Sequence, residues 1–154
     1  MVRLTGLKNG LDILLNGKNV YPHKAKKIGL IDELIHKEGL LQAAIKVAGS
    51  PIKRRPPKKN LLDKALSTSI GRNFVLKKAR ETVKAKTRGN YPAPLKIIDC
   101  VDIGLDNGMA AGLEAESIGF AELHGTQVCK SLIGLFLAMQ DNKKLKNNKK
   151  TENV

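Results

Sequence analysis

The sequence predicts a mostly helical protein with at most one or two short strands. Aromatic residues make up only 3% of the 154 residues and Trp is absent, so Leu, Ile, Val and Ala must build most of the core. That composition favours helices over a β-sandwich. The apolar residues also recur at helical spacing, and Pro and Gly interrupt the pattern at intervals that suit turns between helices.

The first fifty residues carry three predicted helices. In the first helix, four leucines recur at helical spacing: Leu7, Leu11, Leu14 and Leu15. The turn residues 16–19 end that helix. Pro22 then opens a short helix that Gly29 closes, because Pro suits the first turn of a helix and Gly suits its C-cap. The apolar run 30–35 predicts a brief strand, and residues 38–49 return to a helical pattern.

A basic, proline-rich segment at 51–60 is the predicted boundary between two parts of the chain. Its prolines exclude a continuous helix. We therefore expect residues 1–50 to form one part and residues 61–140 to form a second. The Lys- and Asn-rich residues 141–154 have almost nothing to bury, and their composition predicts a disordered tail.

The second part is predicted to be helical almost throughout. Residues 61–87 support one broken helix or two consecutive helices, and 94–108, 109–125 and 126–140 support one helix each. Thr126 can cap the start of the last of these helices. That helix also carries the clearest apolar stripe of the chain, which predicts a buried face: Val128, Leu132, Leu135, Phe136 and Met139.

A rigid hinge, Tyr91-Pro92-Ala93-Pro94, interrupts the helices near the centre of the chain. The two prolines fix two φ angles and favour extended backbone at the residues before them, which sets the direction of the next helix. Pro94 also suits an early position in that helix. Tyr91 can pack its ring while its hydroxyl stays hydrated or hydrogen-bonded.

The formal net charge of +14 points to an anionic partner such as nucleic acid, a membrane surface or a phosphorylated ligand. Much of this charge falls in the linker at 51–59 and in the tail at 143–150. A third concentration of cations lies along one predicted helix, where a solvated face explains it more simply: Lys77, Lys78, Arg80, Lys84, Lys86 and Arg88. A small nucleic-acid-binding protein is the alternative function, although the chain lacks interleaved aromatic residues and any docking motif.

The sequence contains no recognisable nucleophile, metal or phosphate-loop motif. Cys100 and Cys129 each fall inside a helical pattern and are expected to be reduced core thiols. The glycines of 103–112 match neither the dinucleotide nor the P-loop spacing. The three histidines have no Cys or His at metal-ligand spacing: His23, His36 and His124.

Carboxylates are the remaining candidates for catalysis, because paired acids can perform acid–base chemistry. In so basic a chain they are more simply counter-charges for lysines: Asp99, Asp102, Asp106, Glu114, Glu116 and Glu122. Glu116 stands out because it precedes Phe120 by one helical turn, where a buried structural acid would also fit. A complete stand-alone enzyme would need its catalytic acid among Glu114, Glu116 and Glu122.

No apolar run is long enough to span a bilayer, and residues 1–10 lack the apolar core of a signal peptide. The helical pattern starts almost at Met1, so we expect the chain to begin partway through a domain.

Two stretches resemble known families. Residues 10–35, GLDILLNGKNVYPHKAKKIGLIDELI, resemble the helix–turn–helix–strand that follows the active-site region in enoyl-CoA hydratases of the crotonase superfamily. Residues 89–99, GNYPAPLKIID, and the run SLIGLF further on resemble a narrower group. They are similar to the segment that joins the hydratase and 3-hydroxyacyl-CoA dehydrogenase domains in the multifunctional alpha subunit of fatty acid β-oxidation complexes. The order of the pieces agrees over residues 5–140.

The resemblance implies the C-terminal helical part of a crotonase-like fold at 1–50, followed at 61–140 by a helical linker layer that leads to a dehydrogenase domain. It places the family's catalytic glutamates and oxyanion hole before Val2, and its dinucleotide loop after Val154. No catalytic residue and no bound cofactor are therefore expected in this chain, and acyl-CoA and NAD are implied for the parent enzyme only. Met139 stands where single-domain hydratases carry a Lys that reaches the CoA phosphates.

The residues that the resemblance marks as a structural motif are Tyr91, Pro92, Ala93, Pro94, Glu116, Phe120, Leu123 and Thr126. The implied partners are the missing hydratase and dehydrogenase portions and a thiolase beta subunit, in the bacterial cytoplasm or, for the parent, in mitochondria. The chain is expected to support the acyl-CoA site and to be inactive alone. Its apolar face at Leu7, Leu11 and Leu14 is expected to be exposed and to cause self-association.

Overall fold

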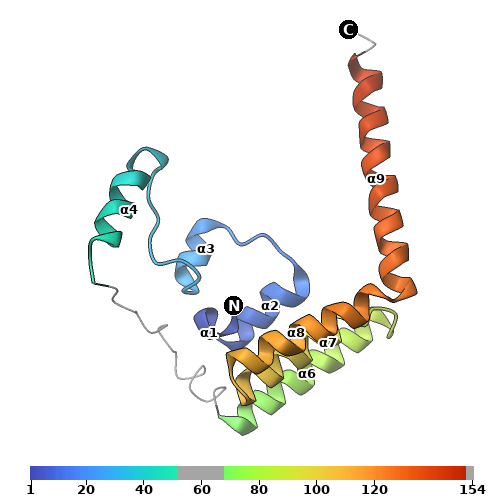
Figure 1. The fold of residues 1–154 in the computed structure, drawn as a ribbon, viewed down its shortest axis with the longest axis horizontal. Coiled ribbons are helices and arrows are strands. Elements are labelled where there is room, and N and C mark those ends of the chain that lie inside the picture. The colour runs from blue at the N-terminus through green and yellow to red at the C-terminus, as the bar shows by residue number, and fades with distance from the viewer. Residues whose placement is uncertain (52–67, 152–154) are drawn as a thin grey trace. The chain divides into compact units, whose positions relative to one another are not determined.

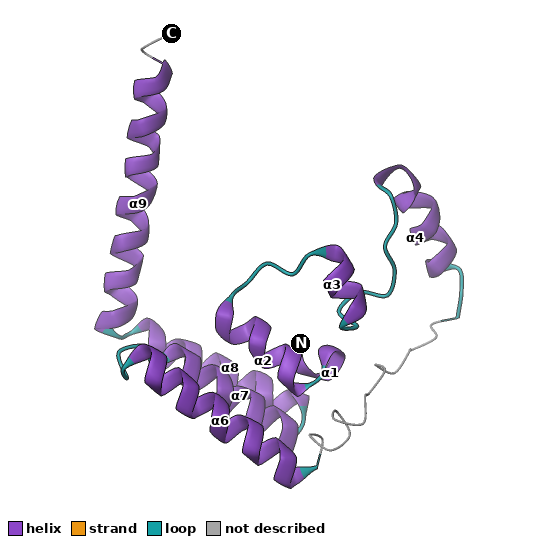
Figure 2. Ribbon diagram, turned by 180° about the vertical axis from the view of Figure 1, so that it is seen from behind, coloured by secondary structure: helices purple, strands orange, loops and turns teal. Residues whose placement is uncertain are grey.

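The computed structural model describes residues 1–51 and 68–151, with side chains described as far as residue 144 (Figures 1 and 2). These residues are mostly helical and contain no strand, which confirms the predicted fold class. The chain divides into two compact units, Met1–Glu81 and Thr82–Val154. The predicted proline-rich linker spans 51–60, and its residues 52–60 lie outside the described residues, as do residues 61–67.

The first unit begins with two short helices that pack closely on each other. These are α1 (Val2–Thr5) and α2 (Leu7–Asn16). Gly10 permits the close contact, since a Cβ built on it would lie 2.7 Å from Cγ2 of Val2. The helix α2 ends where predicted, with the next residue in the left-handed conformation at a φ of 57°.

The short helix α3 (Pro22–Lys27) has Pro at its start and a glycine-based ending, as the sequence predicts. Gly29 adopts a φ of 77°. The amide of Leu30 donates to the carbonyl of Ala25 at 2.9 Å, and the amide of Gly29 donates to that of Lys26 at 3.2 Å. This pair of bonds is a Schellman motif, which satisfies carbonyls that the helix leaves free.

The predicted strand at 30–35 is wrong. These residues are neither helical nor paired in a sheet. An isolated strand leaves its backbone amides and carbonyls unpaired, and the described residues provide no second strand. The apolar pattern at 30–35 indicates packing against a neighbouring element, and the described residues contain no such element.

The last described helix before the gap has no buried residue. It consists of a 3₁₀ turn η1 (Lys37–Gly39) that leads into α4 (Leu40–Ala48). Its large apolar side chains are exposed to solvent: Leu40, Leu41, Ile45 and Val47. The predicted exposed face on α2 is wrong at its centre, because Leu11 is only 4% exposed and Leu7 and Leu14 are half-buried. The exposed apolar surface of the first fifty residues lies instead largely on α4.

The helix α6 (Ser69–Thr87) spans the boundary between the two units. Leu76 and Val83 lie two turns apart on one face, and both are buried. Its end is marked by Arg88 and Gly89, whose φ angles are 50° and 78°. The hydroxyl of Thr87 donates to the carbonyl of Val83 at 2.9 Å and so satisfies part of the helix end.

The hinge that follows is non-helical at residues 90–92, and α7 (Ala93–Asp106) begins directly after it. Pro94 is the second residue of α7, as predicted. The expected extended backbone before Pro94 is wrong, because Ala93 is already helical. Proline is tolerated in the first turn of a helix, because an N–H at that position would have no hydrogen-bond partner inside the helix. The amides of Leu95 and Lys96 both donate to the carbonyl of Pro92, which pulls this turn together.

The helix α8 (Met109–His124) folds back on α7 to form a helical hairpin, and Figures 1 and 2 show the two helices side by side. Asn107 and Gly108 form the predicted turn, with Gly108 at a φ of 94°. Ile98 is completely buried.

The final helix, α9 (Gln127–Thr151), is the longest described (Figure 1). Its backbone continues past residue 141, where the composition predicts disorder. Lys is a good helix former, so it does not oppose that extension. The predicted burial of the stripe on α9 is wrong: Val128, Leu132, Leu135, Phe136 and Met139 are exposed, by 36–59%.

Candidate functional site

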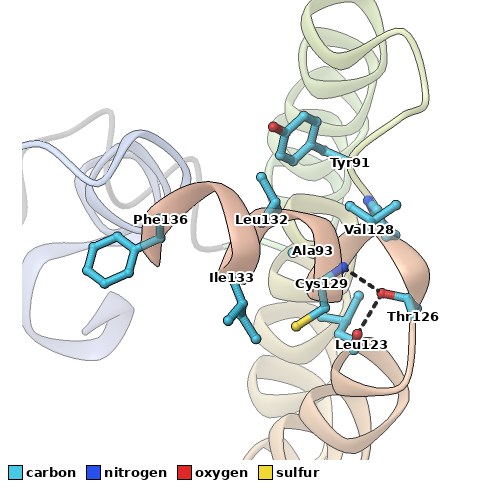
Figure 3. A pocket seen from close by; sticks show the side chains of 10 residues that line it. Tyr91, Ala93, Leu123, Thr126, Val128, Cys129, Leu132, Ile133 and Phe136 are labelled. Atoms are coloured by element: carbon cyan, nitrogen blue, oxygen red, sulfur yellow. Dashed lines mark hydrogen bonds between the residues drawn. The ribbon is translucent and has the colours of Figure 1, made fainter. Parts of the chain in front are cut away.

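An apolar groove lies where the start of α7, the end of α8 and the start of α9 meet (Figure 3). Its volume is about 300 Å³. Ten residues line it: Tyr91, Pro92, Ala93, Leu123, Thr126, Val128, Cys129, Leu132, Ile133 and Phe136. Nearly all of these side chains are aliphatic or aromatic, so the groove suits another apolar surface and not a charged ligand.

Thr126 fixes the angle at which α9 leaves α8. Its hydroxyl donates to the carbonyl of Leu123 at 2.7 Å and accepts a bond from the amide of Cys129 at 3.2 Å (Figure 3). The second bond is the helix cap that the sequence predicts. One side chain therefore ties the last turn of α8 to the first turn of α9, and both turns line the groove.

Five of the eight predicted motif residues lie together in this groove: Tyr91, Pro92, Ala93, Leu123 and Thr126. The other three do not line it. Pro94 is half-buried inside the first turn of α7. Glu116 is exposed, and Phe120 is 71% exposed with its ring stacked on that of His124, 6.2 Å away.

Cys129 and Ile133 line the groove although the sequence pattern did not mark them. Val128, Leu132 and Phe136, which the pattern predicted as a buried stripe, form a wall of the groove instead. The spacing of Cys129 and Ile133 could have identified them. They are one helical turn apart and each follows a stripe residue directly, so they widen the apolar face of the helix. The residues that close the groove from α7 could not be found this way, since they are distant in sequence.

One acid of the hairpin links its two helices. Glu122 on α8 forms an ion pair with Lys96 on α7, and the bond from Glu122 raises the pKa of that Lys. Burial raises the pKa of the Cys100 thiol, and the nearby charges of Glu116 and Asp99 add to the shift. Cys100 therefore stays a neutral thiol near neutral pH and is a poor nucleophile.

Both cysteines are free thiols. Within residues 1–51 and 68–144, no cluster of His, Cys, Asp and Glu has the arrangement that a metal ion needs. Among the described helices, none combines the length and the apolar character needed to cross a membrane. What this part of the chain does present is a helical hairpin, a capped helix junction and a groove that fits apolar side chains. These features suit packing against a further apolar surface.

The chain is similar to curated proteins over most of its length. The chain is 42% identical over 144 residues to the fatty acid oxidation complex subunit alpha of Shewanella baltica strain OS155. It is 43% identical to the protein of the same name from Shewanella amazonensis and 41% identical to that from Shewanella halifaxensis. Each match covers 92% of this chain but only 20% of the relative. No protein-family model matches the chain.

Over 92% of its length, the chain is therefore similar to fatty acid oxidation complex alpha subunits, and it spans about one fifth of the length of these relatives. The resemblance that the sequence shows to these subunits is confirmed.

Proposed function

We propose that this chain is a packing segment of a fatty acid β-oxidation alpha subunit, which supports the acyl-CoA site and carries no catalytic residue itself. The observation that carries the proposal is the match to these subunits across 92% of the chain. The groove adds support, because its wall includes the Tyr-Pro-Ala hinge by which the sequence resembles the joining segment of such subunits.

In this proposal, residues 1–50 complete a hydratase core and residues 61–140 form the layer toward a dehydrogenase domain. The hinge and Thr126 set the directions of α7 and α9 respectively. Their contribution to activity is positional, because a pocket wall displaced by about 1 Å can slow catalysis by about two orders of magnitude. The five motif residues that line the groove act through this packing.

The parent enzyme in this proposal is an enoyl-CoA hydratase and NAD-dependent 3-hydroxyacyl-CoA dehydrogenase of the crotonase superfamily. Acyl-CoA and NAD bind mainly to parts of the parent that this chain does not contain. The relatives are named as alpha subunits of a complex, which supports a partner subunit, and we propose a thiolase beta subunit. Their Shewanella origin supports a bacterial cytoplasmic location.

The relatives support fatty acid oxidation and not the nucleic-acid alternative. The positive charge along α6 then needs no nucleic acid, since long basic side chains cover apolar surface with their stems while their charged ends stay hydrated.

A chimera tests the proposal. The matched segment of the Shewanella baltica subunit is replaced by the corresponding residues of this chain, and the purified chimera is assayed for hydration of crotonyl-CoA and for NAD-dependent oxidation of the 3-hydroxyacyl product. We expect a cooperatively folding protein that retains both activities. A chimera that folds with neither activity, or that does not fold, would overturn the proposal.

A further inference from the structure

The helix α6 exposes two large apolar side chains that the proposed function does not use. Ile70 is 85% exposed, the highest fraction among the large apolar side chains of the described residues, and Phe74 is 66% exposed. The two residues are one helical turn apart, so their side chains are neighbours on the helix surface. Single exposed apolar residues are ordinary, but a neighbouring pair as exposed as this one favours contact with an apolar partner.

This apolar pair belongs to a side of the helix that we call the outer face of α6. Its five residues are all exposed: Ile70, Phe74, Lys77, Glu81 and Lys84. At about 100° per residue, the other four all point within about 40° of the direction of Ile70. The buried Leu76 and Val83 point about 120° and 140° away from that direction. The outer face is therefore opposite the side by which α6 packs.

The helix that carries the outer face is strongly basic. Residues 69–87 contain six Lys and Arg residues and one acid, Glu81, which gives this helix a formal charge of +5. Within the described residues, neither Lys77 nor Lys84 forms an ion pair. Lys78 and Arg80 flank the outer face, one on each side. The outer face thus has an apolar start and a basic continuation that attracts anions.

A nucleic acid and a lipid surface both offer phosphates to these lysines, and the apolar start decides between them. An aliphatic side chain such as Ile70 gains nothing from a hydrated phosphate backbone. Single-stranded nucleic acids stack on several aromatic side chains, and Phe74 is the one aromatic residue of α6. The interface of an anionic bilayer suits both kinds of group, because apolar side chains enter the boundary of the acyl chains while lysines stay beside the head groups.

We propose that the outer face of α6 binds the surface of an anionic bilayer. Ile70 and Phe74 insert at the boundary of the acyl chains, and Lys77 and Lys84 lie beside the lipid phosphates. The helix lies along the surface, which it contacts over the roughly 21 Å from Ile70 to Lys84. This surface is separate from the groove of α7, α8 and α9, and the inference does not depend on the proposed function.

Flotation with vesicles tests the proposal on the purified chain, since aggregated protein does not float. Vesicles of phosphatidylcholine alone are compared with mixed vesicles of phosphatidylcholine and phosphatidylglycerol. The chain is expected to float with the mixed vesicles only, and less as salt is added. Equal flotation with both kinds of vesicle, or flotation with neither, would overturn the proposal.

Charge variants identify the face that binds. Lys77→Gln combined with Lys84→Gln should weaken binding to the mixed vesicles about thirtyfold, because each lysine at an anionic surface contributes about fivefold. The matched control combines Lys8→Gln with Lys24→Gln, which removes the same charge from exposed positions on α2 and α3. It should bind within about twofold of the parent chain. Equal losses in the two double variants would mean that only net charge matters, which contradicts the proposal.

A tryptophan reporter tests the insertion itself. The chain contains no Trp, so Phe74→Trp introduces a single reporter. Phe120→Trp is the matched control, because Phe120 on α8 is 71% exposed. Mixed vesicles should shift the emission of Phe74→Trp to shorter wavelength and leave that of Phe120→Trp unchanged. An unmoved Phe74→Trp emission, or an equal shift in both variants, would overturn the proposal.

A DNA duplex serves as the competing anionic partner. The proposal predicts that Phe74→Ser weakens flotation with the mixed vesicles about tenfold, because an inserted aromatic side chain is lost. Binding to DNA that needs Lys77 and Lys84, in a chain whose flotation is unaffected by Phe74→Ser, would assign the outer face to nucleic acid and overturn the proposal.

Discussion

Gly104 on α7 and Gly112 on α8 face each other across the helical hairpin with no room for a side chain between them. A Cβ built on Gly112 would lie 2.8 Å from the Cα of Gly104, and the reverse distance is 3.3 Å. Both residues are four positions from Gly108 at the turn. The spacing of these three glycines matches no phosphate-binding loop. It instead lets the backbones of α7 and α8 come into contact.

Replacing Gly112 by Ala should destabilise the hairpin. Overpacking costs about 1–3 kcal/mol, and the gain in helix propensity returns about 1 kcal/mol. We therefore expect a net loss of roughly 1 kcal/mol, and a smaller loss for Gly104→Ala, whose contact is longer. Urea denaturation followed by circular dichroism measures both.

Gly134→Ala is the matched control, because nothing lies within 4 Å of a Cβ at that position of α9. It should increase helicity, by about 1 kcal/mol of local helix stability. If Gly112→Ala and Gly134→Ala raise the free energy of unfolding equally, α7 and α8 do not make this close contact.

Removing the hydroxyl of Thr126 should weaken the junction of α8 and α9. Thr126→Ala loses a capping bond, which typically costs about 1 kcal/mol, whereas Thr126→Ser keeps the oxygen. The measurement is the thermal melting of the chain followed by circular dichroism. Equal melting of the two variants would mean that the cap contributes nothing.

The reactivity of Cys100 should depend on Glu116. Burial raises the pKa of this thiol first, and the negative charge of Glu116 raises it further. Glu116→Gln removes that charge and stabilises the thiolate, so the pH profile of alkylation should shift to lower pH. Iodoacetamide rates in a Cys129→Ser background measure the shift, and Glu114→Gln serves as the control. An unchanged profile would remove Glu116 from the surroundings of the thiol.

The purified chain should self-associate, and more strongly as salt is added. Its exposed apolar side chains on α4 and α9 favour association, while its net charge of +14 opposes it. Salt screens that repulsion. Sedimentation at low and high ionic strength measures the effect. A chain that stays monomeric throughout would contradict this prediction, and salt-weakened binding to nucleic acid would revive the discarded alternative.

Local signals made the helix boundaries predictable from the sequence. Gly29 closes α3, Asn107 and Gly108 turn α7 into α8, and Thr126 caps α9, each because its residue type satisfies a specific backbone conformation or bond. These interactions join residues within a few positions of each other. The early helical position of Pro94 was predictable for the same reason.

Tertiary relationships were not predictable in this way. The periodicity of Leu132 and Phe136 shows that a face is apolar, but not which polypeptide covers it or whether it is covered at all. The pairing of Lys96 with Glu122 and the contact of Gly104 with Gly112 both depend on how α8 folds back on α7. The strand expected at 30–35 failed similarly, because a strand needs a partner that the local pattern cannot name.

The most direct test of the central claim is the hydration of crotonyl-CoA by the purified chain, followed as the loss of the conjugated thioester absorbance. A segment that packs and does not catalyse should give no turnover above buffer. Turnover that a single Glu-to-Gln change at Glu114, Glu116 or Glu122 abolishes would contradict the account, because a catalytic acid would then lie on α8 itself.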